Sequence, residues 1–354
     1  MDNDITIGMD LGNKKHAVVA IDADGKPLFR TEVANTPEAL EPFFREHAGA
    51  TVAMETGLCC RWISALARKC GCEVLVGNAR RLSAIWLSKR KNDENDALLI
   101  AKLARADREL FYPVNLRDDE HHAMIQIIEL REIAVSQRTQ IVNSIRGMCK
   151  AGGTFLPKCS ADCFHKVGPN AIPSGERWKF TPLLAQLKQL AETIGRYDKM
   201  LRKYSAKHFR EEVTLLRSVA GVGEVTACAF VAHISDANGF GRARDAGCFF
   251  GLTPGQDQSG DKDAPRCITK TGSSMMRSLL VNSANYILRD ASPDSALKRF
   301  GMRICARGGK VAKRKAKIAV ARKLAVVMLA MLKSGKPYDD GLAATFDKDI
   351  APVI

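Results

Sequence analysis

The chain has 354 residues, more than one typical domain core contains, so two domains and a connecting segment are expected. Lysine and arginine outnumber aspartate and glutamate by 54 to 39, which gives a formal net charge of +15. This excess favours a polyanionic partner, with nucleic acid as the first candidate and an anionic membrane surface as the second. The longest apolar run, 324–332, is far shorter than the ~20 residues that span a bilayer, so it predicts a buried helix.

The N-terminus is acidic and leads directly into a strand pattern, without the basic and apolar segments of a signal peptide. We therefore expect a cytoplasmic protein with no membrane partner. Its 11 cysteines are expected to be reduced packing residues and not a disulfide framework. Cys159, Cys163 and His165 suggest zinc ligands, but no second ligand pair follows at finger spacing, so packing is the favoured interpretation.

The first hundred residues alternate strand and helix patterns. Three strands are predicted first, at 5–11, 17–21 and 27–33, with an Asp-Gly turn after the second. The pattern then predicts a helix from Pro37 to about His47 capped by Thr36, a strand at 50–54, a helix at 58–69, a strand at 73–76 and a helix at 93–106. Three antiparallel strands followed by this alternation are typical of the ribonuclease H order, so residues 1–112 are predicted to form an α/β domain of that type.

Residues 113–210 are predicted to form a helical arm. Apolar residues recur at helical spacing over 118–148 and again over 183–201, while 151–178 is rich in Gly, Pro and Cys and predicts a loop or helix break. Two long helices with a connector make a hairpin or coiled coil, either an intramolecular spacer or a dimerisation arm. Residues 211–354 are Gly-rich and basic and predict a mainly helical domain.

Four carboxylates stand where strands end or a helix begins. Asp10 ends the first predicted strand and Glu55 follows the fourth, and each interrupts an apolar run. Strand ends are where ligands gather in α/β sheets. Asp93 and Asp96 are three residues apart at the start of a helix, which places both on one face, although Asp93 alone could be an ordinary cap.

Carboxylates that converge on one point repel one another unless a cation neutralises them. Hard oxygen ligands of this kind select magnesium, with manganese as the alternative. Phosphodiester chemistry is the reaction class that uses such a site, because metal ions stabilise the attacking and leaving oxygens. The residues therefore predict a metal-dependent nuclease or strand-transfer enzyme.

Three blocks of the N-terminal domain resemble the DEDD transposases of insertion sequences, whose N-terminal domain is similar to Holliday-junction resolvases. The blocks run from Gly8 to His16, from Met54 to Gly57 and from Lys91 to Ala97. The C-terminal half also resembles this family, in its segments 221–223, 249–254, 258–260, 268–272 and 277–280. Ser273 is a departure, because members of the family often have Asn at this position.

The resemblance implies that Asp10, Glu55, Asp93 and Asp96 bind the metal and that a serine of the C-terminal domain forms a covalent link to DNA. Ser259, in a loop of low apolar content, is the serine that matches. Ser273 and Ser274 are rivals, but Ser273 precedes a predicted helix at 275–288 and is interpreted as its cap. The resemblance further implies guidance by a structured RNA encoded in the element, and assembly of homodimers into tetramers.

The C-terminal domain also carries candidate phosphate contacts. Gly221 and Gly223 lie between apolar helices and suggest a helix-hairpin-helix turn, in which small residues let a phosphate approach backbone N–H groups; a tight turn without a ligand is the alternative. The segment from Arg303 to Lys323 holds nine Lys or Arg residues and no acid, which predicts a surface that follows phosphates. The nucleic-acid-binding residues predicted on this basis are Lys270, Arg277, Lys313, Arg314 and Lys315, with the two glycines.

The predicted function is cleavage and exchange of DNA strands during transposition. One alternative is a metal-dependent junction resolvase or nuclease that uses water and forms no covalent intermediate. A second alternative is a non-catalytic nucleic-acid-binding protein whose acidic residues are structural. Ser259 separates the preferred function from the first alternative, and the four carboxylates separate it from the second.

Overall fold

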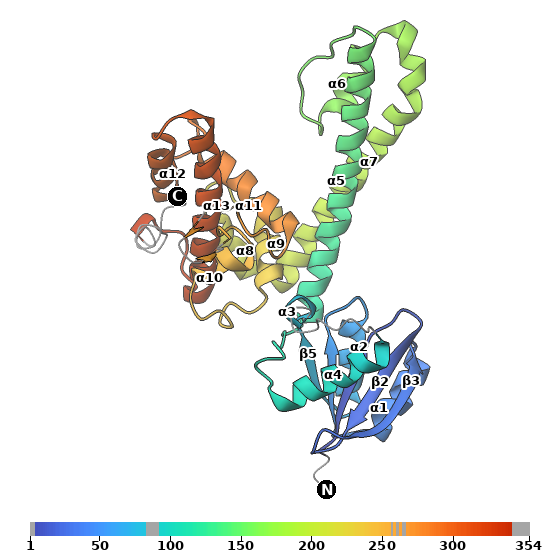
Figure 1. Ribbon diagram of the computed structural model, residues 1–354. Coiled ribbons are helices and arrows are strands. Elements are labelled where there is room, and N and C mark those ends of the chain that lie inside the picture. The colour runs from blue at the N-terminus through green and yellow to red at the C-terminus, as the bar shows by residue number, and fades with distance from the viewer. Residues whose placement is uncertain (1–3, 83–91, 256–257, 260–261, 264–266, 342–354) are drawn as a thin grey trace. The chain divides into compact units, whose positions relative to one another are not determined.

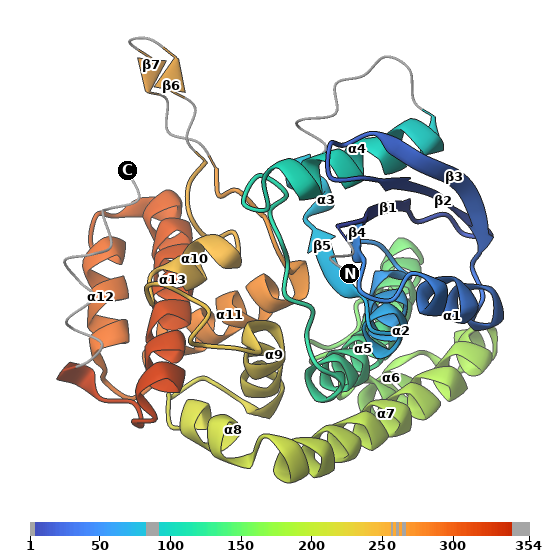
Figure 2. The same ribbon diagram turned by 90° about the horizontal axis from the view of Figure 1, so that it is seen from below.

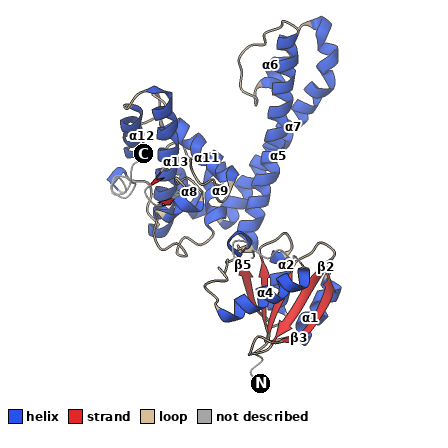
Figure 3. Cartoon of the chain, viewed as in Figure 1, coloured by secondary structure: helices blue, strands red, loops and turns tan. Residues whose placement is uncertain are grey.

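The computed structural model describes residues 4–82, 92–255, 258–259, 262–263 and 267–341 (Figure 1). The chain divides into two compact units, Met1–Arg117 and Asp118–Ile354. The first unit is built on a β-sheet and the second is mostly helical, as Figure 3 shows by colour. The predicted mixed α/β N-terminal domain and mainly helical C-terminal region are therefore confirmed.

Unit 1 contains a five-stranded sheet with the order β3-β2-β1-β4-β5. The three antiparallel strands come first in the chain, and β4 and β5 then pair in parallel with β1 and with each other. The strands are β1 (Thr6–Asp10), β2 (Lys15–Ile21), β3 (Pro27–Ala34), β4 (Thr51–Glu55) and β5 (Glu73–Gly77). Each predicted strand is present, with ends that differ by no more than two residues.

Helices cover both faces of this sheet (Figure 2). Side chains alternate between the two faces of a strand. Ile7 and Met9 of β1 join a buried apolar cluster with residues of α1 (Pro37–Glu46) and α2 (Cys60–Lys69). The opposite face packs against α4 (Asp93–Ala106). The predicted cap of α1 is confirmed, since the Thr36 hydroxyl accepts a hydrogen bond from the backbone N–H of Ala39. A short helix, α3 (Ala79–Leu82), follows β5.

Unit 2 begins with a pair of long helices, α5 (Asp119–Ala151) and α7 (Ser174–His208). They pack along their length, and the Arg131 guanidinium of α5 donates to the Asp198 carboxylate of α7 at 2.7 Å. The loop predicted for 151–178 is wrong in part, because α6 (Phe164–Ala171) forms there and α7 begins at Ser174. Tertiary packing overrides the local Gly and Pro signals, since Phe164 is buried in an apolar cluster with both long helices.

The remaining helices of unit 2 surround α13 (Gly309–Ser334), which packs against α8, α10, α11 and α12. Residues 324–331 of α13 are all buried, which confirms the buried helix predicted for the apolar run. The other elements are α8 (Arg210–Arg217), α9 (Glu224–Ile234), α10 (Asp245–Phe249), β6 (Gln258–Ser259), β7 (Lys262–Asp263), α11 (Ser274–Ile287) and α12 (Ala296–Cys305). Over the residues that the structure describes, no helix has the length and apolar character needed to span a membrane.

Candidate active site

Asp10 and Glu55 are the last residues of two neighbouring parallel strands. The register pairs Met9 of β1 with Met54 of β4, so the residues that follow them stand at the same level of the sheet. Adjacent strands in a sheet lie ~4.8 Å apart. Both side chains are partly exposed. The two carboxylates predicted from strand ends therefore belong to one edge of one sheet.

Both residues also belong to the sheet face that α4 covers. Gly8 lies two residues before Asp10, and a Cβ atom there would be only 2.0 Å from the carbonyl oxygen of Ala97 in α4. Ala53 lies two residues before Glu55 and shares an apolar cluster with Ile100 of α4. Because alternate residues of a strand point to the same face, Asp10 and Glu55 share the face of Gly8 and Ala53.

The direction of α4 brings its first turn toward the same edge. Arg105, near the end of α4, donates to both carboxylate oxygens of Asp4 at 2.8 Å and to the Thr6 hydroxyl at 3.4 Å, at the start of β1. The middle of the helix lies over Gly8. α4 is thus antiparallel to β1, and it begins at the carboxyl end of that strand.

Asp93 and Asp96 occupy the two helix rows that meet the sheet. Residues four apart share one side of a helix. Asp93 precedes Ala97 and Ala101, which pack on β2, whereas Asp96 precedes Ile100 and Ala104, which pack on Ala53 of β4. Asp93 is exposed and Asp96 partly exposed. The acidic first turn lies at the positive end of the helix dipole, which stabilises negative charge.

The donor set suits a hard divalent cation, since all four groups are carboxylates at one edge of unit 1. Their side chains do not yet converge: across the described part of the chain, no three acidic, histidine or cysteine side chains form a group that could hold a metal ion. The zinc ligands considered at Cys159, Cys163 and His165 form no such group either. The fold therefore brings the backbone positions of the four carboxylates to the same end of the sheet.

Ser259 lies in a short two-stranded hairpin of unit 2. β6 pairs antiparallel with β7, and Ser259 is opposite Lys262. The two strands stand apart from the helices of unit 2 (Figure 2). At the base, Gly255 donates to the carbonyl of Cys267 at 3.0 Å and Thr269 donates to that of Thr253 at 2.9 Å. The segment with Ser259 is therefore held by paired backbone at its base.

Arg277 also holds the base of this hairpin. Its Nη1 atom donates to the carbonyl oxygens of Phe250 at 3.3 Å and Gly272 at 3.2 Å, and also to that of Thr271. Lys270 is exposed and has a left-handed backbone, with a φ of 56°. Ser273 caps α11, and its hydroxyl accepts from the N–H of Met276 at 3.2 Å, which confirms the predicted cap.

The nine cations between Arg303 and Lys323 do not form one uniform surface. Lys313 and Arg314 are exposed and Lys315 is partly exposed, as expected for phosphate contacts. Lys323 is completely buried, with its Nζ atom 4.6 Å from the centre of the Phe300 ring. Burial, and to a lesser extent the charge of Arg303, lowers the pKa of Lys323 to about 8. Lys323 therefore belongs to the core and not to the predicted surface.

The turn between α8 and α9 contains the two candidate glycines. A Cβ atom on Gly221, where φ is +92°, would lie 2.9 Å from the Tyr286 ring of α11, whereas Gly223 has open space around it. Glu224, the first residue of α9, pairs with Arg217 at 2.8 Å. Gly221 thus allows close packing against α11, and Gly223 leaves space at the start of α9.

Two family models of known proteins match this chain. A family model of the IS110 DEDD type, described as a transposase, matches residues 7–151. A second family model, described as the transposase of the IS116/IS110/IS902 family, matches residues 213–300. The chain belongs to this family of DEDD transposases. It is an insertion-sequence transposase, and DNA is its substrate.

Individual relatives extend over most of this transposase. The transposase for insertion sequence element IS1111A of Coxiella burnetii is 29% identical over 72% of the chain and 70% of its own length. The transposase for insertion sequence element IS1328 of Yersinia enterocolitica is 24% identical over 82% of the chain and 85% of its own length. The insertion element IS116 protein of 44.8 kDa from Streptomyces clavuligerus is 24% identical over 94% of the chain and 96% of its own length.

Most candidate residues of the transposase lie within the ranges that the two family models match. All four carboxylates lie within the first range, and Ser259, Lys270, Arg277 and the two glycines lie within the second. Lys313, Arg314 and Lys315 lie beyond both. The prediction that these three residues bind nucleic acid therefore depends on their charge alone.

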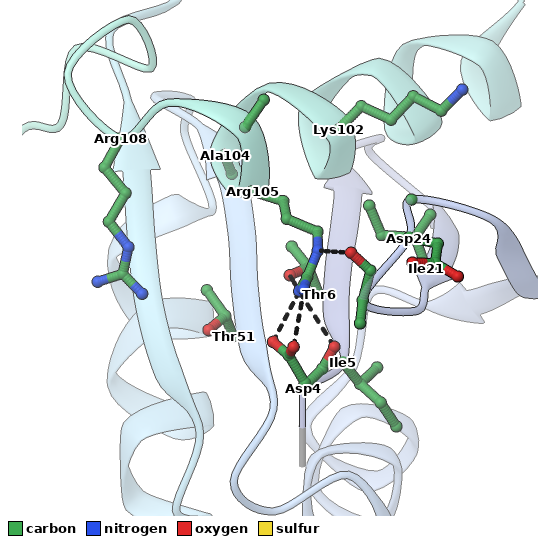
Figure 4. A pocket seen from close by; sticks show the side chains of 13 residues that line it. Asp4, Ile5, Thr6, Ile21, Asp24, Thr51, Lys102, Ala104, Arg105 and Arg108 are labelled. Atoms are coloured by element: carbon green, nitrogen blue, oxygen red, sulfur yellow. Dashed lines mark hydrogen bonds and ion pairs between the residues drawn. The ribbon is translucent and has the colours of Figure 1, made fainter. Parts of the chain in front are cut away.

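A polar hollow of about 730 Å³ lies at the other edge of the sheet and was not predicted (Figure 4). Asp4, Thr6, Lys102, Arg105 and Arg108 line it. The guanidinium of Arg105 holds the pKa of Asp4 below its usual range, mainly through the hydrogen bond between them. Arg108 is likewise paired, with Glu73 at 2.6 Å. These ion pairs fasten the end of α4 to the sheet.

Proposed function

We propose that this transposase cleaves and exchanges DNA strands with a metal site formed by Asp10, Glu55, Asp93 and Asp96 and with Ser259 as nucleophile. The observation that carries the proposal is the meeting of two strand ends and the first turn of α4 at one edge of the sheet. Four carboxylates brought to one edge would repel one another without a cation. Magnesium, or manganese in its place, fits oxygen ligands of this kind.

The order of the strands supports a ribonuclease-H-like assignment for unit 1. Three antiparallel strands precede two parallel ones, and helices cover both faces. In this arrangement β1 lies between β2 and β4. The acidic residue of β1 thus lies next to that of β4, which is the arrangement that a shared cation requires.

A bound metal ion would act as a Lewis acid. It would stabilise the negative charge that develops on the oxygen atoms around the reacting phosphorus. The chain's own contribution is rigidity and orientation. Asp10 and Glu55 lie on paired strands, and Asp93 and Asp96 lie on a helix fixed to the sheet at its far end by Arg105. Such positioning accounts for much of the rate that enzymes achieve in phosphoryl transfer.

Ser259 would attack the scissile phosphate. Its Oγ forms a bond to phosphorus while the bond from phosphorus to the leaving oxygen breaks, and the hydroxyl proton passes to a base as the leaving oxygen gains one. The ester keeps the phosphorus activated, so a second hydroxyl can displace the serine and join a new strand. Hydrolysis with water would instead leave free ends and no ester between protein and DNA.

The exposed cations of unit 2 suit a nucleic-acid partner. Lys270, Lys313 and Arg314 are exposed, and few aromatic residues accompany them, so contact with phosphates is favoured over stacking on bases. We include a structured guide RNA from the element and assembly of homodimers into tetramers in the proposal. The pair of long helices, α5 and α7, is the candidate coiled-coil arm for that assembly.

Denaturing electrophoresis of the protein with DNA that contains the element ends, the guide RNA and Mg²⁺ tests the proposal. Wild-type protein should give cut DNA and a slowed protein–DNA band. Alanine at Asp10, Glu55, Asp93 or Asp96 should abolish both, whereas Glu94→Gln, a change in the same turn of α4, should keep both. Active Asp10→Ala and Glu55→Ala variants would refute the metal site.

The same experiment tests Ser259 as the nucleophile separately from the metal site. Ser259→Ala should lose the slowed band, and Ser278→Ala, which changes another serine of unit 2, should keep it. Cut DNA without any slowed band in the wild type would favour the junction resolvase that uses water. A band that maps to a peptide with Ser273 or Ser274 would show that Ser259 is the wrong serine.

A further inference from the structure

Asn35 contacts the two loops that follow the strand-end carboxylates. It is the first residue after β3, and its side-chain Nδ2 lies 3.1 Å from the carbonyl oxygen of Asn13 and 3.4 Å from that of Gly12. The same nitrogen lies 3.4 Å from the Sγ of Cys59. The backbone N–H of Asn35 donates to Lys14 at 2.9 Å. The side-chain amide of Asn35 therefore links the segment of Gly12 and Asn13 to the segment of Cys59.

These segments are the ones that carry Asp10 and Glu55. Gly12 and Asn13 form the turn immediately after Asp10, and this turn is tight, because a Cβ atom on Gly12 would lie 2.3 Å from the carbonyl oxygen of Lys15. Cys59 is the residue before α2 and lies four positions after Glu55. A shift of Asn35 would thus move the ends of both strands.

The contacts of Asn35 require an N–H donor, because its Nδ2 faces two carbonyl oxygens and a sulfur. Its Oδ1 is buried and has no hydrogen-bond partner among the described residues, and the same holds for both ring nitrogens of His16. His16 is completely buried, and burial is the main cause that lowers its pKa. An aspartate here would place a carboxylate among carbonyl oxygens and remove the N–H donors, although its shape is the same.

We propose that Asn35 is a positioning residue for the metal site, which fixes the spacing of Asp10 and Glu55 through the turn at Gly12 and Asn13 and through Cys59. The inference rests on the proposed function of those two carboxylates. Asn35 is not one of the proposed metal ligands, and its Nδ2 contacts Gly12, Asn13 and Cys59. Its effect is on the geometry of the ligands, and groups of this kind commonly change metal affinity by ~10- to 100-fold.

Binding of Mn²⁺ to the full chain tests this inference without catalysis, by the electron paramagnetic resonance signal of free Mn²⁺. Asn35→Asp and Asn35→Ala should weaken binding by ~10-fold or more. Thr36→Ala is the matched control, since it removes the neighbouring cap of α1 but touches neither loop. It should lower the midpoint of thermal unfolding as helix caps do, and it should leave the Mn²⁺ affinity at the wild-type value.

Wild-type affinity in both Asn35 variants would overturn the inference, and so would an equal loss of affinity in Thr36→Ala, because the effect would then be general destabilisation. If neither Asn35 variant folds, Cys59→Ala takes their place: it removes only the sulfur that links Asn35 to the Glu55 segment, and unchanged affinity would overturn the inference. Asp10→Ala must lose Mn²⁺ binding in every case. If it binds as the wild type does, the proposed metal site is wrong and the role of Asn35 falls with it.

Discussion

Replacing Gly8 by alanine should separate α4 from the sheet and so damage the carboxylate edge without touching a carboxylate. The new Cβ would lie 2.0 Å from the carbonyl oxygen of Ala97 and 2.6 Å from the amide nitrogen of Ala101. Ordinary contacts begin near 3.4 Å, so the nearest atom is 3.4 − 2.0 = 1.4 Å too close. Both obstacles are backbone atoms of one helix, so the helix must move as a body.

The size of the effect follows from that displacement. Extra methylenes in a packed core typically cost ~1 to 3 kcal/mol. For a domain of about a hundred residues, each kcal/mol lowers the unfolding midpoint by roughly 4 to 8 °C. A shift of ~1 Å in a catalytic arrangement can reduce the rate by ~10²-fold. Cleavage should therefore fall by much more than the loss of folded protein explains.

Calorimetry and a single-turnover cleavage assay, both below the unfolding transition, measure the two effects separately. Gly147→Ala is the control, because Gly147 is an exposed residue inside α5 with open space around it. Alanine there should stabilise the helix by up to ~1 kcal/mol and leave cleavage unchanged. A Gly8→Ala protein with the wild-type midpoint and the wild-type rate would refute the close contact between β1 and α4.

Three further predictions concern unit 2. Asp340 accepts from the first N–H of α12 at 2.9 Å, and this bond and Arg299 hold its pKa below the usual range. Asp340→Asn keeps an acceptor oxygen but removes the charge, so it should cost ~1 kcal/mol at neutral pH, the usual difference between charged and neutral hydrogen bonds. That loss should disappear in urea unfolding as the pH falls below 3.8 through the folded pKa, and a loss that persists in acid would contradict the assignment. Lys323 has a pKa of about 8 in the folded protein against an ordinary 10.5, so the free energy of unfolding should rise with pH across that interval. Lys323→Met should remove this part of the rise. Identical pH profiles for the wild type and the variant would contradict the prediction. Changing Lys313, Arg314 and Lys315 together to alanine should reduce the slope of log K against log salt for DNA binding by ~2 to 3, and an unchanged slope would exclude contact with phosphates there.

Much of unit 1 could be predicted from the sequence because local signals there agree with the fold. The strands alternate or are continuously apolar, Thr36 caps its helix, and α4 begins at Asp93 as predicted. The strand ends also indicated Asp10 and Glu55 as candidates. The sequence could not show how these elements pack against one another. The antiparallel packing of α4 on β1 depends on contacts of Gly8 and Arg105, and no local sequence pattern indicates those contacts.

The differences in unit 2 have the same cause. α6 forms in a segment rich in Gly and Pro because Phe164 packs between the long helices. Lys323 stands in a strongly basic segment and is nevertheless buried against Phe300. The prediction that Arg277 contacts phosphate stays a prediction, but the sequence did not indicate that one of its nitrogens donates to loop carbonyls. In each case a long-range contact decides the environment, and charge or periodicity along the chain does not reveal it.

Anomalous scattering from crystals of the protein grown with Mn²⁺ tests the central proposal most directly, because manganese is located independently of the refined coordinates. We expect a peak at the carboxyl edge of β1 and β4, with carboxylate oxygens of Asp10, Glu55 and the first turn of α4 at ~2.0 to 2.2 Å. The same peak should be missing from crystals of Asp10→Ala. Manganese bound elsewhere in the wild type, with none at this edge, would contradict the assignment of the four carboxylates.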